Sequence, residues 1–145
     1  ARWMGGWADA LITIATDRDT MRGIVDAFRE GGGEHKPMFL QVALAFAPSD
    51  DEAADAAYDQ WRQCALSSDQ LADLPSPEAF DEAARAVTRD DVVSRIRISS
   101  SIEHHLDLVR EDAAMGFERI YLHNVARDHQ ERFIDALAPA LAAWG

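Results

Sequence analysis

Short apolar runs alternate with amphipathic stretches along this chain, and no other feature constrains the fold as strongly. Three runs predict strands: residues 10–13 (ALIT), 38–47 (MFLQVALAFA) and 119–124 (RIYLHN). The stretches between them repeat their apolar residues every three to four positions, as helices do. Strands that alternate with helices predict an α/β fold with a parallel sheet. We expect residues 38–47 to be covered on both faces, because Gln41 alone interrupts the apolar run.

Capping signals indicate where several helices begin. Ser49 precedes three acidic residues, and Glu52 lies at the position that completes a capping box. Residues 67–95 contain two further helix starts, at Ser76-Pro77 and at Thr88 with Asp91. These residues therefore predict a helical insert between strands. The stretches that predict longer helices are 17–33, 50–66, 101–116 and 128–144.

Composition limits the classes of function. The 145 residues suit one domain, and a formal net charge of −12 repels phosphate backbones and anionic lipid. Neither a nucleic-acid partner nor a membrane surface is therefore expected. The chain has no apolar run near the ~20 residues of a membrane span, and it shows no signal-peptide pattern. Its single cysteine, Cys64, fits a reducing compartment, so we expect a cytoplasmic protein.

Histidine and tryptophan residues give weaker signals. His104 and His105 are neighbours on a predicted helix, so they point about 100° apart and cannot share a metal from one face. We expect them on a solvated helix and expect no metal site, since a single cysteine offers no thiolate set. Trp3 and Trp7 are expected in the core or at an interface.

Three segments carry a resemblance to a known family. They are WMGGWADALIT (3–13), FLQVALAFAPSDDEAADAAYDQW (39–61) and GFERIYLHNVARDHQERFIDALAPAL (116–141). In this order they resemble the C-terminal part of the luciferase-like flavin- and deazaflavin-dependent oxidoreductases. The branch with the most similar pattern includes the deazaflavin-dependent glucose-6-phosphate dehydrogenases.

The resemblance implies a (β/α)8 TIM-type barrel, of which residues 1–145 would be the C-terminal part within one domain. Residues 10–13, 38–47 and 119–124 would be strands six, seven and eight, and the insert at 67–95 would lie between the last two. The N-terminal half of the barrel would then be absent from this chain. It is the partner that the resemblance implies, because three parallel strands leave two open edges. The resemblance leaves a homo-oligomer open.

The resemblance also implies an activity. It is hydride transfer between a small organic substrate and FMN or the deazaflavin F-420, in an oxidoreductase or monooxygenase. FMN is slightly favoured, because the sugar-phosphate features of the deazaflavin dehydrogenases are missing. By alignment, their basic phosphate ligands correspond to Asp17, Ser94 and Glu131, so a sugar phosphate is not the expected substrate.

Active sites of such barrels lie at the C-terminal ends of the strands. The residues predicted to line a cofactor or substrate pocket are Thr13, Gln41, Phe46, His123 and Asn124. His123 and Asn124 could instead cap the strand and hydrogen-bond the last helix, and Gln41 could satisfy a neighbouring group. No catalytic residue is assigned, because the family's acid and base residues lie mainly on the early strands. We therefore expect the chain alone to be inactive.

A second class of function stays open. The chain could be a non-enzymatic, acidic α/β domain that binds a partner through its open sheet edges.

Overall fold

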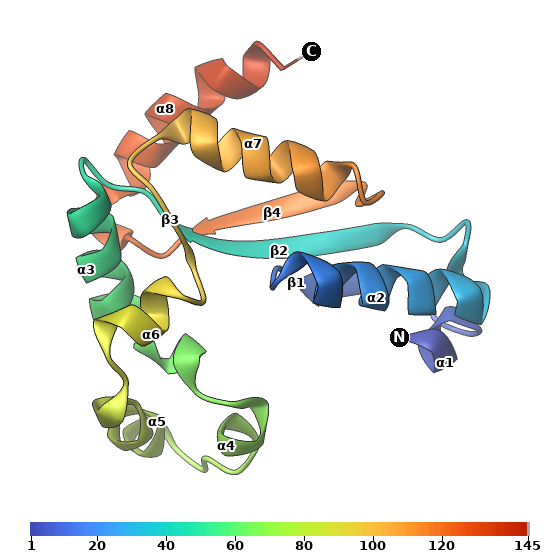
Figure 1. The fold of residues 1–145 in the computed structure, drawn as a ribbon, viewed down its shortest axis with the longest axis horizontal. Helices are drawn as coiled ribbons and strands as arrows, with labels where there is room; N and C mark the ends of the chain where they lie inside the picture. The colour runs from blue at the N-terminus through green and yellow to red at the C-terminus, as the bar shows by residue number, and fades with distance from the viewer. Residues whose placement is uncertain (145) are drawn as a thin grey trace. The chain divides into compact units, whose positions relative to one another are not determined.

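The computed structural model describes residues 1–144 and divides the chain into two compact units. The first unit consists of Ala1–Ala43 and His104–His123, and the second of Leu44–Glu103 and Asn124–Gly145. Figure 1 labels the helices and strands. The strands are β1 (Leu11–Ile14), β2 (Met38–Ala45), β3 (Arg97–Ile98) and β4 (Arg119–Asn124). The α-helices are α1 (Arg2–Gly5), α2 (Arg18–Phe28), α3 (Asp50–Trp61), α4 (Ser68–Ala72), α5 (Pro77–Ala83), α6 (Arg89–Val93), α7 (Ile102–Ala113) and α8 (Gln130–Ala142).

The sheet is parallel. β1 pairs with β2 from Leu11 opposite Met38 to Ile14 opposite Gln41, and β3 pairs with the end of β2. β4 also pairs with β2. The N–H of Glu118 donates to the carbonyl of Met38, and the N–H of Val125 donates to the carbonyl of Leu44. Residue numbers therefore rise together along the two strands, so β4 is parallel to β2. The predicted α/β class with a parallel sheet is confirmed, and the sheet is small and open.

One face of the sheet in the first unit packs against α2. The apolar residues of α2 recur at helical spacing, so Met21, Val25 and Phe28 form one buried stripe. They contact alternate residues of β2, including Leu40 and Val42. The same cluster contains Leu11, Met38 and Phe117, with Ile120 and Leu122 of β4 packed against it.

The opposite face of these strands is uncovered in the first unit, which corrects the expectation of burial on both faces for residues 38–43; residues 44–47, in the second unit, are buried as expected. Along β2, buried residues alternate with more exposed ones, and Gln41 is exposed. Ile12 and Ile14 of β1 expose 65% and 66% of their surface. Sequence reasoning expected both faces to be covered because a continuous apolar run has no polar side to indicate exposure.

Three glycines let α1 pack against the end of α2. Helix α2 continues into a single π-type turn, Arg29–Gly33, in which Gly32 has φ 107°. A Cβ on Gly31 would overlap the carbonyl of Arg2, and one on Gly5 would overlap the carbonyl of Phe28. The chain's one lysine, Lys36, donates from Nζ to the Gly5 carbonyl at 2.7 Å. Gly5 and Gly31 therefore permit this close contact, because neither carries a Cβ.

The tryptophans of the α1 region are not part of a core. Trp3 and Trp7 expose 78% and 59% of their surface, and their rings contact edge to face with centroids 5.0 Å apart. These two residues are therefore not core groups, and their alternative place at an interface stays a prediction.

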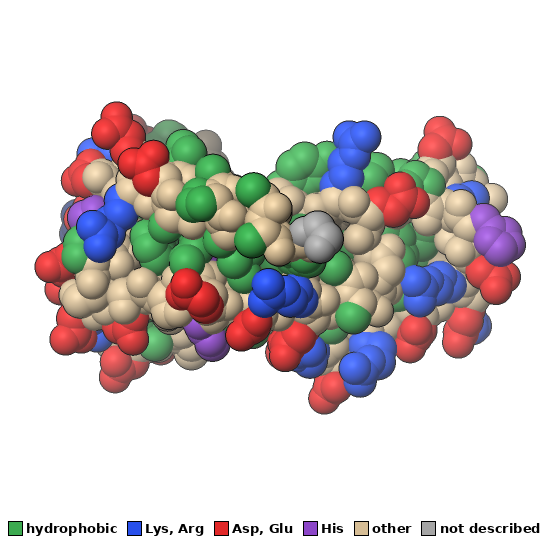
Figure 2. Space-filling model, turned by 90° about the horizontal axis from the view of Figure 1, so that it is seen from above, with side chains coloured by type: hydrophobic (Ala, Val, Ile, Leu, Met, Phe, Trp, Pro, Cys, Tyr) green, Lys and Arg blue, Asp and Glu red, His purple; other side chains and the backbone are tan. Residues whose placement is uncertain are grey.

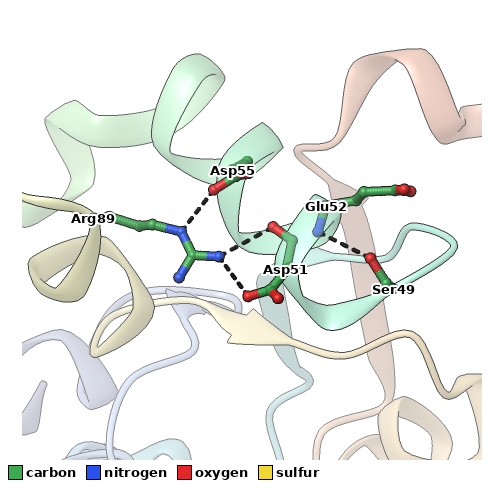
Figure 3. Close-up of polar contacts among 5 residues, drawn as sticks. All are labelled: Ser49, Asp51, Glu52, Asp55 and Arg89. Atoms are coloured by element: carbon green, nitrogen blue, oxygen red, sulfur yellow. Dashed lines mark hydrogen bonds and ion pairs between the residues drawn. The ribbon is translucent and has the colours of Figure 1, made fainter.

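The second unit contains the helical insert. Helices α4, α5 and α6 occupy Ser68–Val93, where the sequence predicted helices, and α4 adds a capping box of Ser67 with Gln70 that the prediction missed. Ser49 caps α3 by accepting from the N–H of Glu52, as expected (Figure 3). Arg89 of α6 donates to Asp55 at 2.7 Å and to Asp51 at 3.1 Å, which ties α6 to α3 (Figure 3).

The paired histidines of α7 differ from expectation. His104 is exposed, whereas His105 is buried together with Leu106, Val109 and Asp112. Both residues were expected on a solvated helix. The buried side of α7 includes the position of His105, so the helix buries a polar side chain that sequence reasoning placed in solvent.

Candidate functional site

The uncovered face of the sheet in the first unit carries the best candidate for a functional surface. Side chains alternate between the two faces of a strand, so the residues out of phase with the buried cluster share this face. Two of the predicted site residues, Gln41 and His123, lie on it. We call it the open sheet face, and it consists of Ile12, Ile14, Phe39, Gln41, Ala43, Arg119, Tyr121 and His123.

The open sheet face combines apolar surface with a few polar groups. Tyr121 exposes 47% of its surface, and the guanidinium carbon of Arg119 lies 5.9 Å from the centroid of the Phe39 ring. Gln41 adds an amide and His123 an imidazole. Ligand sites in proteins usually have this composition, with aromatic and aliphatic surface that binds and polar groups that orient. Sequence reasoning missed Ile12, Ile14 and Tyr121. Of these, Tyr121 lies two residues before the predicted His123, so the strand period could have identified it.

Thr13 lies on the other side of the sheet from Gln41. It is in phase with Leu11, which belongs to the buried cluster, and it is paired in register with Leu40. Its side chain is half-buried. Thr13 and Gln41 therefore point to opposite faces within the first unit.

Asn124 joins the ends of two strands in the second unit. Its side chain is 2% exposed, and its Oδ1 accepts from the N–H of Phe46 at 2.9 Å and of Ala126 at 3.3 Å. Its Nδ2 donates to the carbonyls of the same two residues. Gln130 at the start of α8 donates to the Asn124 carbonyl. For Asn124 this geometry favours the second alternative, a side chain that closes the strand end and holds the last helix.

Phe46 follows β2 and is buried beside Asn124. Its ring contacts that of Phe133 in α8, with centroids 5.8 Å apart. The structure therefore brings Phe46 and Asn124 together through hydrogen bonds, and places Gln41 and His123 on one face of the first unit. Thr13 belongs to neither group, and the lining of a cofactor or substrate pocket by Gln41 and His123 stays a prediction.

The three positions aligned with phosphate ligands have local roles. Asp17 caps α2 by accepting from the N–H of Thr20 at 2.9 Å, and this hydrogen bond lowers the pKa of the Asp17 carboxyl. Ser94 donates to the Asp91 carbonyl at the end of α6. Glu131 lies in the first turn of α8, where a negative charge is favourable. Each of the three side chains thus suits the helix end on which it lies.

Charges are mixed on the surface, as Figure 2 shows for one face, where red carboxylates lie among blue cations. Within residues 1–144, no group of three or more histidine, cysteine or acidic side chains is arranged to hold a metal ion. No helix in this part of the chain is long and apolar enough to cross a membrane.

Comparison with known proteins identifies a similar fold. No family model matches the sequence, and no curated protein matches it. Among solved structures, the chain is similar to an F420-dependent secondary alcohol dehydrogenase in complex with an F420-acetone adduct, with a TM-score of 0.71 and 18% sequence identity. The match covers 94% of this chain and 45% of that chain. The chain therefore spans less than half the length of the enzyme that its fold resembles.

Proposed function

We propose that this chain is part of a luciferase-like, deazaflavin-dependent oxidoreductase. The observation that carries the proposal is the fold similarity to the F420-dependent alcohol dehydrogenase over 94% of the chain. The three sequence segments that resemble the luciferase-like oxidoreductases point to the same family. In this proposal β1, β2 and β4 are strands six to eight of a (β/α)8 barrel, and the open sheet face is turned toward the barrel interior.

The open sheet face fits a flat, aromatic cofactor in its chemistry. A deazaflavin presents an apolar ring with polar edges, and toward the C-terminal ends of the strands this face offers Ile14 and Ala43 beside Gln41 and His123. When bound, the deazaflavin accepts or donates the hydride. The apolar side chains would exclude water from the ring, and the amide of Gln41 and the imidazole of His123 would hydrogen-bond its edge or the substrate oxygen.

The comparison does not support the slight preference for FMN over the deazaflavin. The missing sugar-phosphate ligands, on which that preference depends, concern the substrate rather than the cofactor. The similar enzyme binds F420, which supports the deazaflavin. That enzyme's acetone adduct also supports a small neutral alcohol or ketone as substrate.

Cofactor titration of the protein that contains this chain tests the proposal. We expect saturable binding of the deazaflavin, weaker binding of FMN, and at least tenfold weaker deazaflavin binding after His123→Ala, because His123 lies near the C-terminal end of β4. His104→Ala is the matched control, because His104 is an exposed histidine of α7 that does not belong to the open sheet face. If neither flavin binds and a protein partner instead protects Ile12 and Ile14, the domain functions by partner binding.

Substrate choice gives a separate test. The deazaflavin-loaded protein should not be reduced by glucose 6-phosphate, because Asp17 and Glu131 place carboxylates where the resembled enzymes hold the phosphate. A small secondary alcohol should reduce it. Saturable reduction by glucose 6-phosphate would show that the alignment of these positions is wrong.

A further inference from the structure

A groove between α2 and α7 in the first unit has a volume of about 360 Å³. It is separate from the open sheet face, because α2 lies on the buried face of the sheet. The charged residues that line the groove are Arg18, Arg22, Arg29, Asp26 and Glu111, with Met115 at its end.

The spacing of the arginines places them on one face of the helix. Arg18 and Arg22 are four residues apart, and Arg29 follows after seven more. At 3.6 residues per turn, these intervals return to nearly the same side of α2 and of the turn that continues it. Three guanidinium groups therefore project toward the same groove.

Two of the guanidinium groups are held in place by the protein. Arg29 donates from Nη2 to the Met115 carbonyl at 3.0 Å. Gly116, which has φ 97°, leaves room for this group, since a Cβ there would overlap Nη2 of Arg29. Arg18 forms an ion pair with Glu111 of α7. The groove therefore has two anchored cationic walls.

Arg22 is the cation with unused capacity. Among the described residues its ion pair is with Asp19, at 4.0 Å, which is beyond hydrogen-bonding distance. Guanidinium groups present paired N–H donors that match the oxygens of a tetrahedral oxyanion. Arg22 can therefore donate to a bound anion without giving up a hydrogen bond within the protein.

The charge balance of the lining favours an anion. The lining carries three guanidinium groups and the carboxylates of Asp26 and Glu111, which is one net positive charge in a chain whose net charge is −12. The further carboxylate of Asp19, 4.0 Å from Arg22, is 97% exposed, so solvent screens it. We propose that this groove binds inorganic phosphate, with Arg22 as the principal ligand and Arg18 and Arg29 as supporting cations. The site does not depend on the proposed oxidoreductase function.

Calorimetric titration with inorganic phosphate at constant ionic strength tests the proposal. We expect saturable binding that becomes at least tenfold weaker after Arg22→Gln. Arg85→Gln is the matched control, because Arg85 is also an exposed helical arginine with an acidic residue three positions before it, but belongs to the second unit. The control should bind phosphate as the unmodified protein does.

A second variant separates binding from a purely structural ion pair. Glu111→Gln removes one carboxylate from the lining, so phosphate binding should become severalfold tighter. If the arginines only join α2 to α7, Glu111→Gln will leave phosphate affinity unchanged or lower. The proposal would be overturned if the unmodified protein and Arg22→Gln bound phosphate with equal affinity. It would also be overturned if the unmodified protein bound chloride as tightly as phosphate.

Discussion

At the scale of single residues, Asn124 shows how one amide can organise a strand end. Asn124→Ala should leave the buried N–H groups of Phe46 and Ala126 without their acceptor, at a cost of about 1–3 kcal/mol for each group. We expect the exchange rate of both amides with solvent to rise at least tenfold. Glu131→Ala, on the exposed start of α8, should leave these rates unchanged. Equal rates in both variants would mean that the side chain does not hold the strand end.

Gly31 is the second residue whose role depends on a close approach. Gly31→Ala should displace α1, because the added Cβ would overlap the Arg2 carbonyl. Proteolysis at Arg2 and the fluorescence of Trp3 and Trp7 would report this displacement. The matched control is Gly23→Ala in α2, where a Cβ meets nothing within 4 Å and should stabilise the helix by about 0.5–1 kcal/mol. A protected α1 in Gly31→Ala would contradict the packing described here.

At the scale of elements, α6 begins with a capping box of Thr88 and Asp91, and the stability of this cap should depend on the protonation of the Asp91 carboxyl. Hydrogen bonds from the Thr88 side chain and backbone lower the pKa of Asp91. Because the folded pKa lies below the unfolded value of about 3.9, the cap stabilises α6 above that pH. This contribution is lost as the pH falls through the folded pKa. The amide resonance of Thr88 should titrate with a midpoint below about 3.9, and should not do so in Asp91→Asn. A midpoint at or above that value would show that the cap is not formed.

At the scale of the whole molecule, the open sheet face should govern solubility. Exposed Ile12 and Ile14 predict that the isolated chain binds hydrophobic dyes or aggregates. Ile14→Lys should reduce both effects, but should prevent completion of the proposed barrel. Ile134→Lys, which changes an exposed residue of α8, should do neither. A chain that melts cooperatively as a monomer, without dye binding, would contradict this prediction.

The sequence by itself determined the elements and the fold class. The apolar runs and the 3.6-residue periods, with caps at Ser49, Ser76 and Thr88, are local signals, so they located β1, β2, β4, α5 and α6 closely, whereas the start of α4 was missed. An apolar run, however, does not show which face of its strand is covered. For Gln41, an apolar run gave no indication of exposure, and the residue was placed in a buried strand.

Only the tertiary structure decided how side chains are used. The double hydrogen bonding of Asn124 to Phe46 joins residues 78 positions apart, and no local pattern announces such a partner. Likewise, the contact of α1 with Gly31 and the burial of His105 depend on which surfaces meet after folding. Periodicity and capping act over a few residues, whereas burial and the choice of hydrogen-bond partner depend on segments that are distant in sequence. The sequence therefore predicted the helices and strands better than the roles of the candidate site residues.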